Sequence, residues 1–153
     1  MQAKPSKNCY QEKTNWEDAL DTFRLDDRLA RDSVLITKLG LCQLRLQNDC
    51  RWPWLVLVPQ RGDMSEMFDL TPLDQTTLAF EINQVASALK QLTGAAKINV
   101  GALGNIVRQL HVHVIARNEG DPCWPGPIWG QGTPVAYSDE DRHNFMQKLA
   151  GAL

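Results

Sequence analysis

Residues 107–117 read VRQLHVHVIAR, and polar and apolar side chains alternate through most of this segment. Successive side chains of a β-strand point to opposite faces, so the pattern predicts a strand. Its polar face is the row Gln109, His111 and His113. Such a row, with neighbours about 6–7 Å apart along the strand, is costly to bury against an apolar layer. We therefore expect one strand face to join a core and the other to line a cleft.

Four further segments have the short, β-branched and apolar character of strands and are bounded by turn residues. They are 33–39, 41–46, 54–58 and 97–101. Every residue of 54–58 is apolar, which predicts burial of both faces of that strand or a dimer interface on one of them.

A long helix is predicted between Thr71 and Gly94. Thr71 suits the N-cap, and Asp74 stands where a capping box places an acid. Apolar residues follow in one stripe, and Gly94 can end the helix in the left-handed conformation. A helix capped by Asn15 and another that begins at Ser138 are also expected.

Together these elements predict an α+β fold. It has about five strands in an antiparallel sheet, one long helix and additional terminal helices. A length of 153 residues suits a single domain. We expect residues 1–14 to form a loose polar lead-in and residues 118–153 to form a loop and a C-terminal helix.

The composition excludes several classes of protein. A net charge of −2 argues against a nucleic-acid backbone as the main partner, because such proteins carry a basic excess. The longest apolar run, 54–58, is too short to span a membrane, and the first residues lack a secretory leader. The cysteines at positions 9, 42, 50 and 123 have no CxxC spacing, so we expect a reduced, cytoplasmic protein.

The residues alone leave three interpretations of the histidine pair open. The two imidazoles can be polar groups on a solvated face without a role. They can also share a metal ion, but no carboxylate or third histidine stands nearby, and His143 is distant. Finally, an imidazole can act as a nucleophile near neutral pH, because a reference pKa of about 6.5 leaves much of it neutral.

The segments around the pair resemble the histidine triad (HIT) superfamily of nucleotide hydrolases and transferases. The signature of that family is H-x-H-x-H on a strand, after a Gly-containing turn and an upstream amide. Gln109, His111 and His113 match the three histidines with glutamine in first place. Asn105 occupies the turn position, and Asn99 the position of the upstream amide.

The resemblance covers about residues 20–130. Residues 53–59, PWLVLVP, are similar to the family strand P-x-H-x-L-V-x-P, with Trp54 in place of the histidine. Residues 121–127, DPCWPGP, look like the tail of bacterial members that resemble diadenosine polyphosphate hydrolases.

The resemblance implies that His111 attacks the α-phosphorus of a nucleotide and forms a nucleotidyl-histidine that water resolves. The other ring nitrogen is expected to donate to a backbone carbonyl, which fixes the tautomer. His113 would contact the α-phosphate or the leaving oxygen, and Asn99 and Asn105 would donate to phosphate oxygens. Asn48 is the candidate for the ribose contact. Asn48 as a plain turn residue and Asn99 as a strand-end amide are the alternatives.

Three positions depart from the family pattern. Gln109 can donate to a phosphate but cannot become a cation, Ile106 stands where many relatives have Ser or Thr, and Trp54 replaces a histidine. We therefore expect a reduced polar shell. The expected function is hydrolysis or nucleotidyl transfer on a dinucleoside polyphosphate or a nucleoside phosphoramidate. The alternative is a nucleotide-binding sensor module with little or no catalysis.

The implied partner is a small-molecule nucleotide, with no nucleic acid and no membrane. We expect no tightly bound cofactor and no metal site, although a divalent cation such as Mg²⁺ can accompany the substrate phosphates. Family members pair through the long helix and a strand, which implies a homodimer. Trp124 and Trp129 lie in a loop rich in Pro and Gly, which could cover the phosphates or dock on a second subunit.

Overall fold

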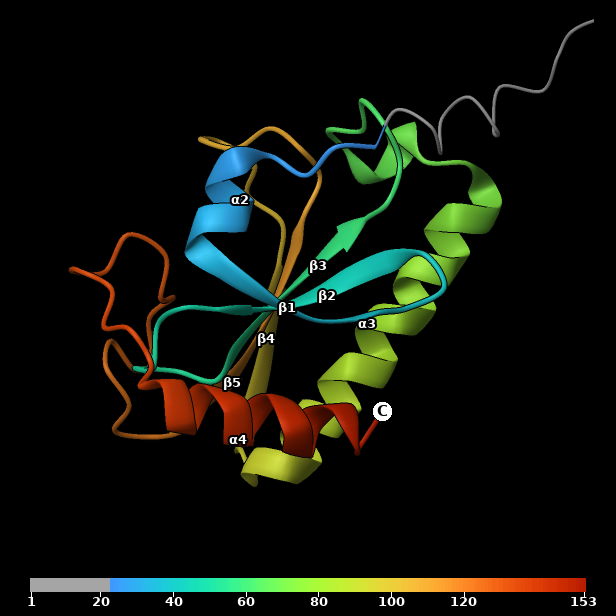
Figure 1. Ribbon diagram of the computed structural model, residues 1–153. Coiled ribbons are helices and arrows are strands. Elements are labelled where there is room, and N and C mark those ends of the chain that lie inside the picture. The colour runs from blue at the N-terminus through green and yellow to red at the C-terminus, as the bar shows by residue number, and fades with distance from the viewer. Residues whose placement is uncertain (1–22) are drawn as a thin grey trace, which may run out of the picture.

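The computed structural model describes residues 23–153, so the helix expected to begin at Asn15 lies largely outside the described residues. One antiparallel sheet has the strand order β1-β2-β3-β5-β4 (Figure 1). The strands are β1 Ser33–Lys38, β2 Cys42–Gln47, β3 Trp54–Pro59, β4 Lys97–Gly101 and β5 Val112–Arg117. The helices are α2 Asp27–Asp32, α3 Pro72–Thr93, α4 Asp139–Ala150 and the short 3₁₀ turn η1 Met67–Asp69. The expected α+β fold is confirmed.

Different helices cover the two faces of the sheet (Figure 1). On one face, α3 and α4 bury the main core, in which Leu57 of β3 and Leu89 of α3 belong to one cluster. On the other face, Leu29 of α2 packs with Val56 and Val58 of β3. Both faces of β3 are therefore buried within one chain, as its apolar run predicted. No helix among residues 23–153 is long and apolar enough to cross a membrane.

Both ends of α3 lie where the sequence predicted them, but Asp74 has a different partner from the one expected. Thr71 Oγ1 accepts the N–H of Asp74 at 3.1 Å, and Gly94 ends the helix with a φ of +65°. The carboxylate of Asp74 does not complete the capping box at Thr71. Both of its oxygens accept from the Arg61 guanidinium, at 2.9 and 2.8 Å. The ion pair between Arg61 and Asp74 holds the segment after β3 against the start of α3.

β5 begins later than the alternation predicted. The expected strand 107–116 is a strand only from Val112, because its pairing with β3 ends where Val112 faces Leu57. The residues before it find another partner, and the N–H of Leu110 donates to the carbonyl of Met64 at 2.8 Å. Gln109 therefore lies outside the sheet, while His113 lies within it.

The long loop after β5 is held against the sheet by Arg117. Its guanidinium makes two 2.7 Å contacts with the carboxylate of Asp121 and donates to the carbonyl of Gly126 at 3.0 Å. Further along the loop, Trp129 lies on Gly101 of β4. A Cβ at that glycine would be 2.9 Å from the indole Cη2, so the close approach requires glycine.

The N-cap of α3 provides a test of the fold. Thr71→Ala should lower the free energy of unfolding by about 1 kcal/mol, because the N–H of Asp74 loses its acceptor. Urea denaturation measures the change. Thr76→Ala is the matched control, since Thr76 lies on the exposed side of the same helix and only bonds back to Pro72. Equal losses in the two variants would contradict the assigned cap.

Candidate active site

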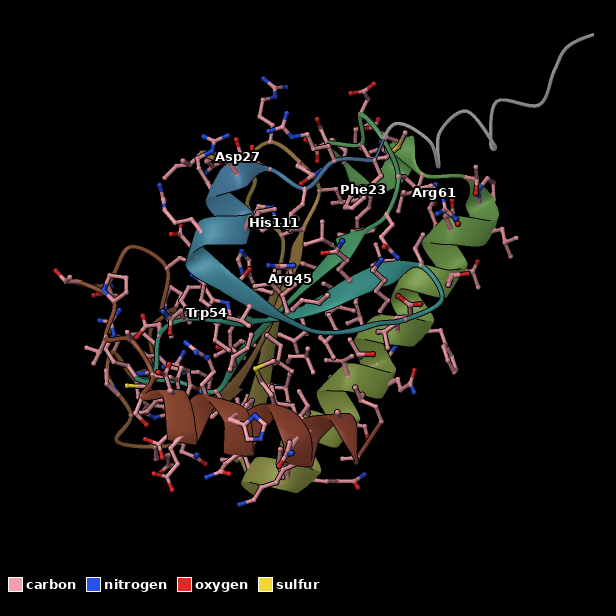
Figure 2. All side chains as sticks on the ribbon, viewed as in Figure 1. Phe23, Asp27, Arg45, Trp54, Arg61 and His111 are labelled. Carbon is pink, nitrogen blue, oxygen red and sulfur yellow. The ribbon has the colours of Figure 1, made fainter. Side chains whose placement is uncertain are left out.

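His111 directly precedes β5 and lies on the α2 side of the sheet (Figure 2). His113 of β5 pairs with Val56, whose side chain packs with Leu29 of α2. The two rings meet edge to face, with centroids 4.9 Å apart and planes at 81°. Each residue is only 7% exposed. The alternation therefore placed both imidazoles on one face, as expected.

The ring of His111 is held in one tautomer. Its Nδ1 lies 2.7 Å from the backbone carbonyl of Gln109. A carbonyl only accepts hydrogen bonds, so Nδ1 carries the proton and the lone pair is on Nε2. Nε2 has no hydrogen-bond partner among residues 23–153. This is the arrangement that a nucleophilic imidazole requires.

A cavity of about 450 Å³ opens at His111. We call it the site pocket. Three segments line it, namely 65–68, 102–105 and 108–111. It brings Asn105 and Gln109 together with His111, as the sequence predicted. The apolar side chains of Met67, Phe68 and Leu103 form much of the remaining wall.

Gln109 does not continue the histidine row along the strand. Its Oε1 accepts the N–H of Asp26 at 2.9 Å, and its Nε2 donates to the carbonyl of Arg24 at 2.8 Å. The side chain thus ties the segment before α2 to the chain beside His111. The expected linear row is corrected to a pair of histidines that meet edge to face, with Gln109 outside the strand. The cause is the early end of β5 pairing, which frees residue 109 from the pleat.

Trp54, which stands in place of a histidine, still makes a hydrogen bond within the site. Its indole Nε1–H donates to Nδ1 of His113 at 2.9 Å. The ring of Trp129 stands on another side of His113, with a centroid distance of 5.7 Å. Burial among these rings, with a smaller contribution from His111, lowers the pKa of His113 to about 3. His113 is therefore neutral at physiological pH.

An ion pair in α2 shapes the turn that borders the site pocket. The Asp26 carboxylate caps α2 and accepts from the guanidinium of Arg28, whose hydrogen bonds lower the pKa of Asp26 to about 2. Nη1 of Arg28 also donates to the carbonyl of Ile106 at 2.9 Å. The Ile106 side chain itself is exposed. Sequence reasoning missed Arg28, because its partner carbonyl is 78 positions away.

Arg108 is a second residue that sequence reasoning missed. It is exposed, lines the site pocket and forms no ion pair with any residue from 23 to 153. The only sign of it in the sequence was its position directly before Gln109, the first residue of the triad. An unpaired cation beside His111 is suited to hold the oxygens of a phosphate.

Two of the predicted site residues lie elsewhere. Asn99 faces Ile115 across β4 and β5, and its Oδ1 accepts from Arg117 at 3.1 Å. Asn48 follows β2 at the other end of the sheet, where its Oδ1 accepts the N–H of Tyr137 at 3.2 Å. Neither lines the site pocket, and His113 does not line it either, although its ring contacts that of His111.

The described residues hold no cluster of three or more His, Cys, Asp or Glu side chains that could bind a metal ion. His143, the remaining histidine, is exposed on α4.

A family model described as the HIT domain matches residues 28–120. The chain belongs to the histidine triad (HIT) family. A solved histidine triad (HIT) protein from Sinorhizobium meliloti is 61% identical, with a TM-score of 0.86 over 88% of this chain and 99% of that one. A histidine triad protein from Bradyrhizobium japonicum is 42% identical, with a TM-score of 0.84 over 86% and 98% of the two chains.

A third HIT structure, from Marinobacter aquaeolei, is also 42% identical, with a TM-score of 0.85 over 86% of this chain and 96% of that one. No curated protein sequence matches the chain. Membership of the HIT family supports nucleotide binding or nucleotide hydrolysis as the general function.

The low pKa of His113 predicts how stability depends on pH. The unfolded imidazole takes up a proton below about pH 6.5, whereas the folded one resists it down to about 3. The stability that depends on the neutral ring of His113 is therefore fully present above pH 6.5 and is lost as the pH falls. The free energy of unfolding should decrease by about 1.5 kcal/mol between pH 6.5 and pH 5.

His113→Gln should flatten that part of the profile, as measured by urea denaturation at the two pH values. His143→Gln is the matched control and should keep the wild-type slope, because His143 is exposed. The same slope in wild type and His113→Gln would contradict the assignment.

Proposed function

We propose that this HIT protein transfers a nucleotidyl group to His111 and then to water. The electrophile is the α-phosphorus of a dinucleoside polyphosphate or a nucleoside phosphoramidate. The observation that carries the proposal is the bond from Nδ1–H of His111 to the Gln109 carbonyl, because it leaves the Nε2 lone pair free beside the site pocket. A covalent intermediate divides one difficult displacement into two easier ones.

The site pocket supplies donors for the charge that develops during transfer. Asn105 and Arg108 both line it, and an amide and a guanidinium can each donate to non-bridging phosphate oxygens. Gln109 retains one N–H that is not used by Arg24, so it can still donate to a phosphate. In this proposal Mg²⁺ enters as a companion of the substrate phosphates, without a site of its own in the protein.

His111→Asn should reduce turnover by on the order of 10³-fold or more, because it removes the nucleophile. Nucleotide binding, followed by calorimetry with a non-hydrolysable analogue, should stay measurable. His143→Asn is the matched control and should keep wild-type turnover. Mass spectrometry of the wild type, quenched at alkaline pH during turnover, should find one nucleotidyl group on His111.

Full activity of His111→Asn on all substrates tested would show that another group is the nucleophile. Tight nucleotide binding by the wild type, with neither turnover nor adduct, would instead identify a nucleotide-binding sensor module.

We also propose a homodimer in which β4 pairs with its copy. β4 is an edge strand of the sheet, and Val100 on it is 48% exposed. Leu73 and Phe80 of α3 are exposed as well, at 75% and 69%. Unpaired strand edges and exposed apolar side chains favour association with a second copy.

Sedimentation analysis tests this interface. The wild type should sediment as a dimer, and Val100→Glu should sediment as a monomer, because it brings two carboxylates together at the paired edge. Val135→Glu is the matched control, since Val135 is 50% exposed but lies in the loop before α4. A monomeric wild type, or a dimeric Val100→Glu, would exclude pairing through β4.

A further inference from the structure

Within residues 23–153, the ring of His113 has one hydrogen bond, and that bond determines where its proton is. The indole Nε1–H of Trp54 is a donor only, and it lies 2.9 Å from Nδ1 of His113. Nδ1 must therefore be the unprotonated nitrogen, and the single proton of the neutral ring is on Nε2. A second proton on Nδ1 would oppose the indole N–H directly.

We propose that Trp54 is a positioning residue that keeps His113 a neutral Nε2–H donor, and that the site accordingly cleaves bonds whose leaving group departs as an anion. The proposal rests on the proposed function of His111. It selects phosphoanhydrides, such as dinucleoside polyphosphates, over nucleoside phosphoramidates.

The neighbours of His113 in the described part of the chain do not restore its charge. Val56 and Gly101 flank it on the neighbouring strands, and Trp129 covers it from the loop. His111 is its titratable neighbour on β5. On the same sheet face, Arg45 of β2 pairs with Val56, which adds no negative charge next to His113.

His113 does not itself line the site pocket, but its ring contacts that of His111, which does. The polar groups that line the pocket do not act as proton donors to a leaving group. Ser65 is an alcohol and therefore a very weak acid, Asn105 and Gln109 are amides, and Arg108 does not lose its proton in proteins. His111 gives its Nδ1–H to a carbonyl and uses Nε2 for the attack. Glu66, at the outer wall, is part of a capping box with Asp69. A leaving group in this pocket therefore receives hydrogen bonds but no proton.

The proposed step balances without an acid. The Nε2 lone pair forms the bond to the α-phosphorus, and the bond from that phosphorus to the bridging oxygen breaks. The electron pair leaves with the oxygen, which becomes a terminal phosphate oxygen of the departing polyphosphate. In the second step, water adds its oxygen to phosphorus, one proton goes to solvent, and Nε2 recovers its lone pair.

A phosphoanhydride and a phosphoramidate differ at the departure step. The oxygen of a leaving phosphate is stable as an anion near neutral pH, because its last pKa is about 6. The nitrogen of a leaving amine must gain a proton as the P–N bond breaks. A site that offers only hydrogen bonds therefore favours the anhydride.

The first experiment varies the leaving group on a constant adenylyl group. Diadenosine tetraphosphate should be cleaved with a kcat/KM at least on the order of 10²-fold above that of adenosine 5′-phosphoramidate. Aryl esters of AMP should show kcat values that fall steeply as the pKa of the departing phenol rises. An equal or faster phosphoramidate reaction, or rates independent of the phenol pKa, would overturn the proposal.

The second experiment tests Trp54 without requiring turnover. The chain has only three histidines, so ¹⁵N spectra of the imidazoles can be assigned. In the wild type, His113 should show a protonated Nε2 and an unprotonated Nδ1 throughout pH 5–8. Trp54→Phe should produce a mixture of tautomers, and Trp54→His, which keeps an N–H donor, should restore the single form.

Trp52→Phe is the matched control. The indole of Trp52 donates to the carbonyl of Pro122 and makes no hydrogen bond to a histidine. Its spectra and kinetics should match the wild type, whereas Trp54→Phe should lower kcat about tenfold with KM changed less than twofold. Unchanged His113 signals in Trp54→Phe would overturn the role of Trp54. A wild type that cleaves none of the substrates would overturn the proposed function, while the spectra would still decide what holds His113.

Discussion

The register of β5 between β3 and β4 is the constraint on which the site depends. It places His113 directly between Val56 and Gly101. Valine leaves space beside the ring, and glycine leaves space for the indole of Trp129. The same register sets Trp54 opposite Ile115, two residues along the same face, from which its indole reaches Nδ1 of His113. A shift of one residue would turn both imidazoles into the core.

Glutamine replaces histidine at the first position of the triad, and its side chain has a structural role. An imidazole there would have offered a charge to the substrate, whereas Gln109 offers two hydrogen bonds to the backbone of residues 24 and 26. Those bonds hold the start of α2 beside the site. From there, Arg28 reaches the carbonyl of Ile106 and steadies the turn that carries Asn105. Gln109 therefore helps to hold the wall of the site pocket in place.

Positive charge at the site is correspondingly sparse. His113 is held neutral, Gln109 and Asn105 are amides, and Arg108 on the pocket wall forms no ion pair with the residues that the structure describes. Neutral donors can bind an anionic phosphate without the desolvation penalty of a buried charge. The net charge of −2 agrees with this design, because a small nucleotide needs local donors and not a basic surface.

Sequence alone determined the features that depend on neighbours along the chain. The cap at Thr71, the end at Gly94, the five strands and the common face of His111 and His113 all follow from local period and propensity. The resemblance to the HIT family also implied that one ring nitrogen of His111 donates to a backbone carbonyl, and the structure shows that the nitrogen is Nδ1 and the carbonyl that of Gln109.

Only the tertiary structure decided the features whose partners are distant. The residues that bond Trp54 to His113 are 59 positions apart, and those that bond Gln109 to Asp26 are 83 apart. The same holds for Asn99, whose carbonyl is taken by Arg117. Composition and spacing show that these side chains can form hydrogen bonds, but sheet register and packing choose the partner. The sequence suggested that Trp54 makes the site less polar, whereas in the structure it is the group that orients His113.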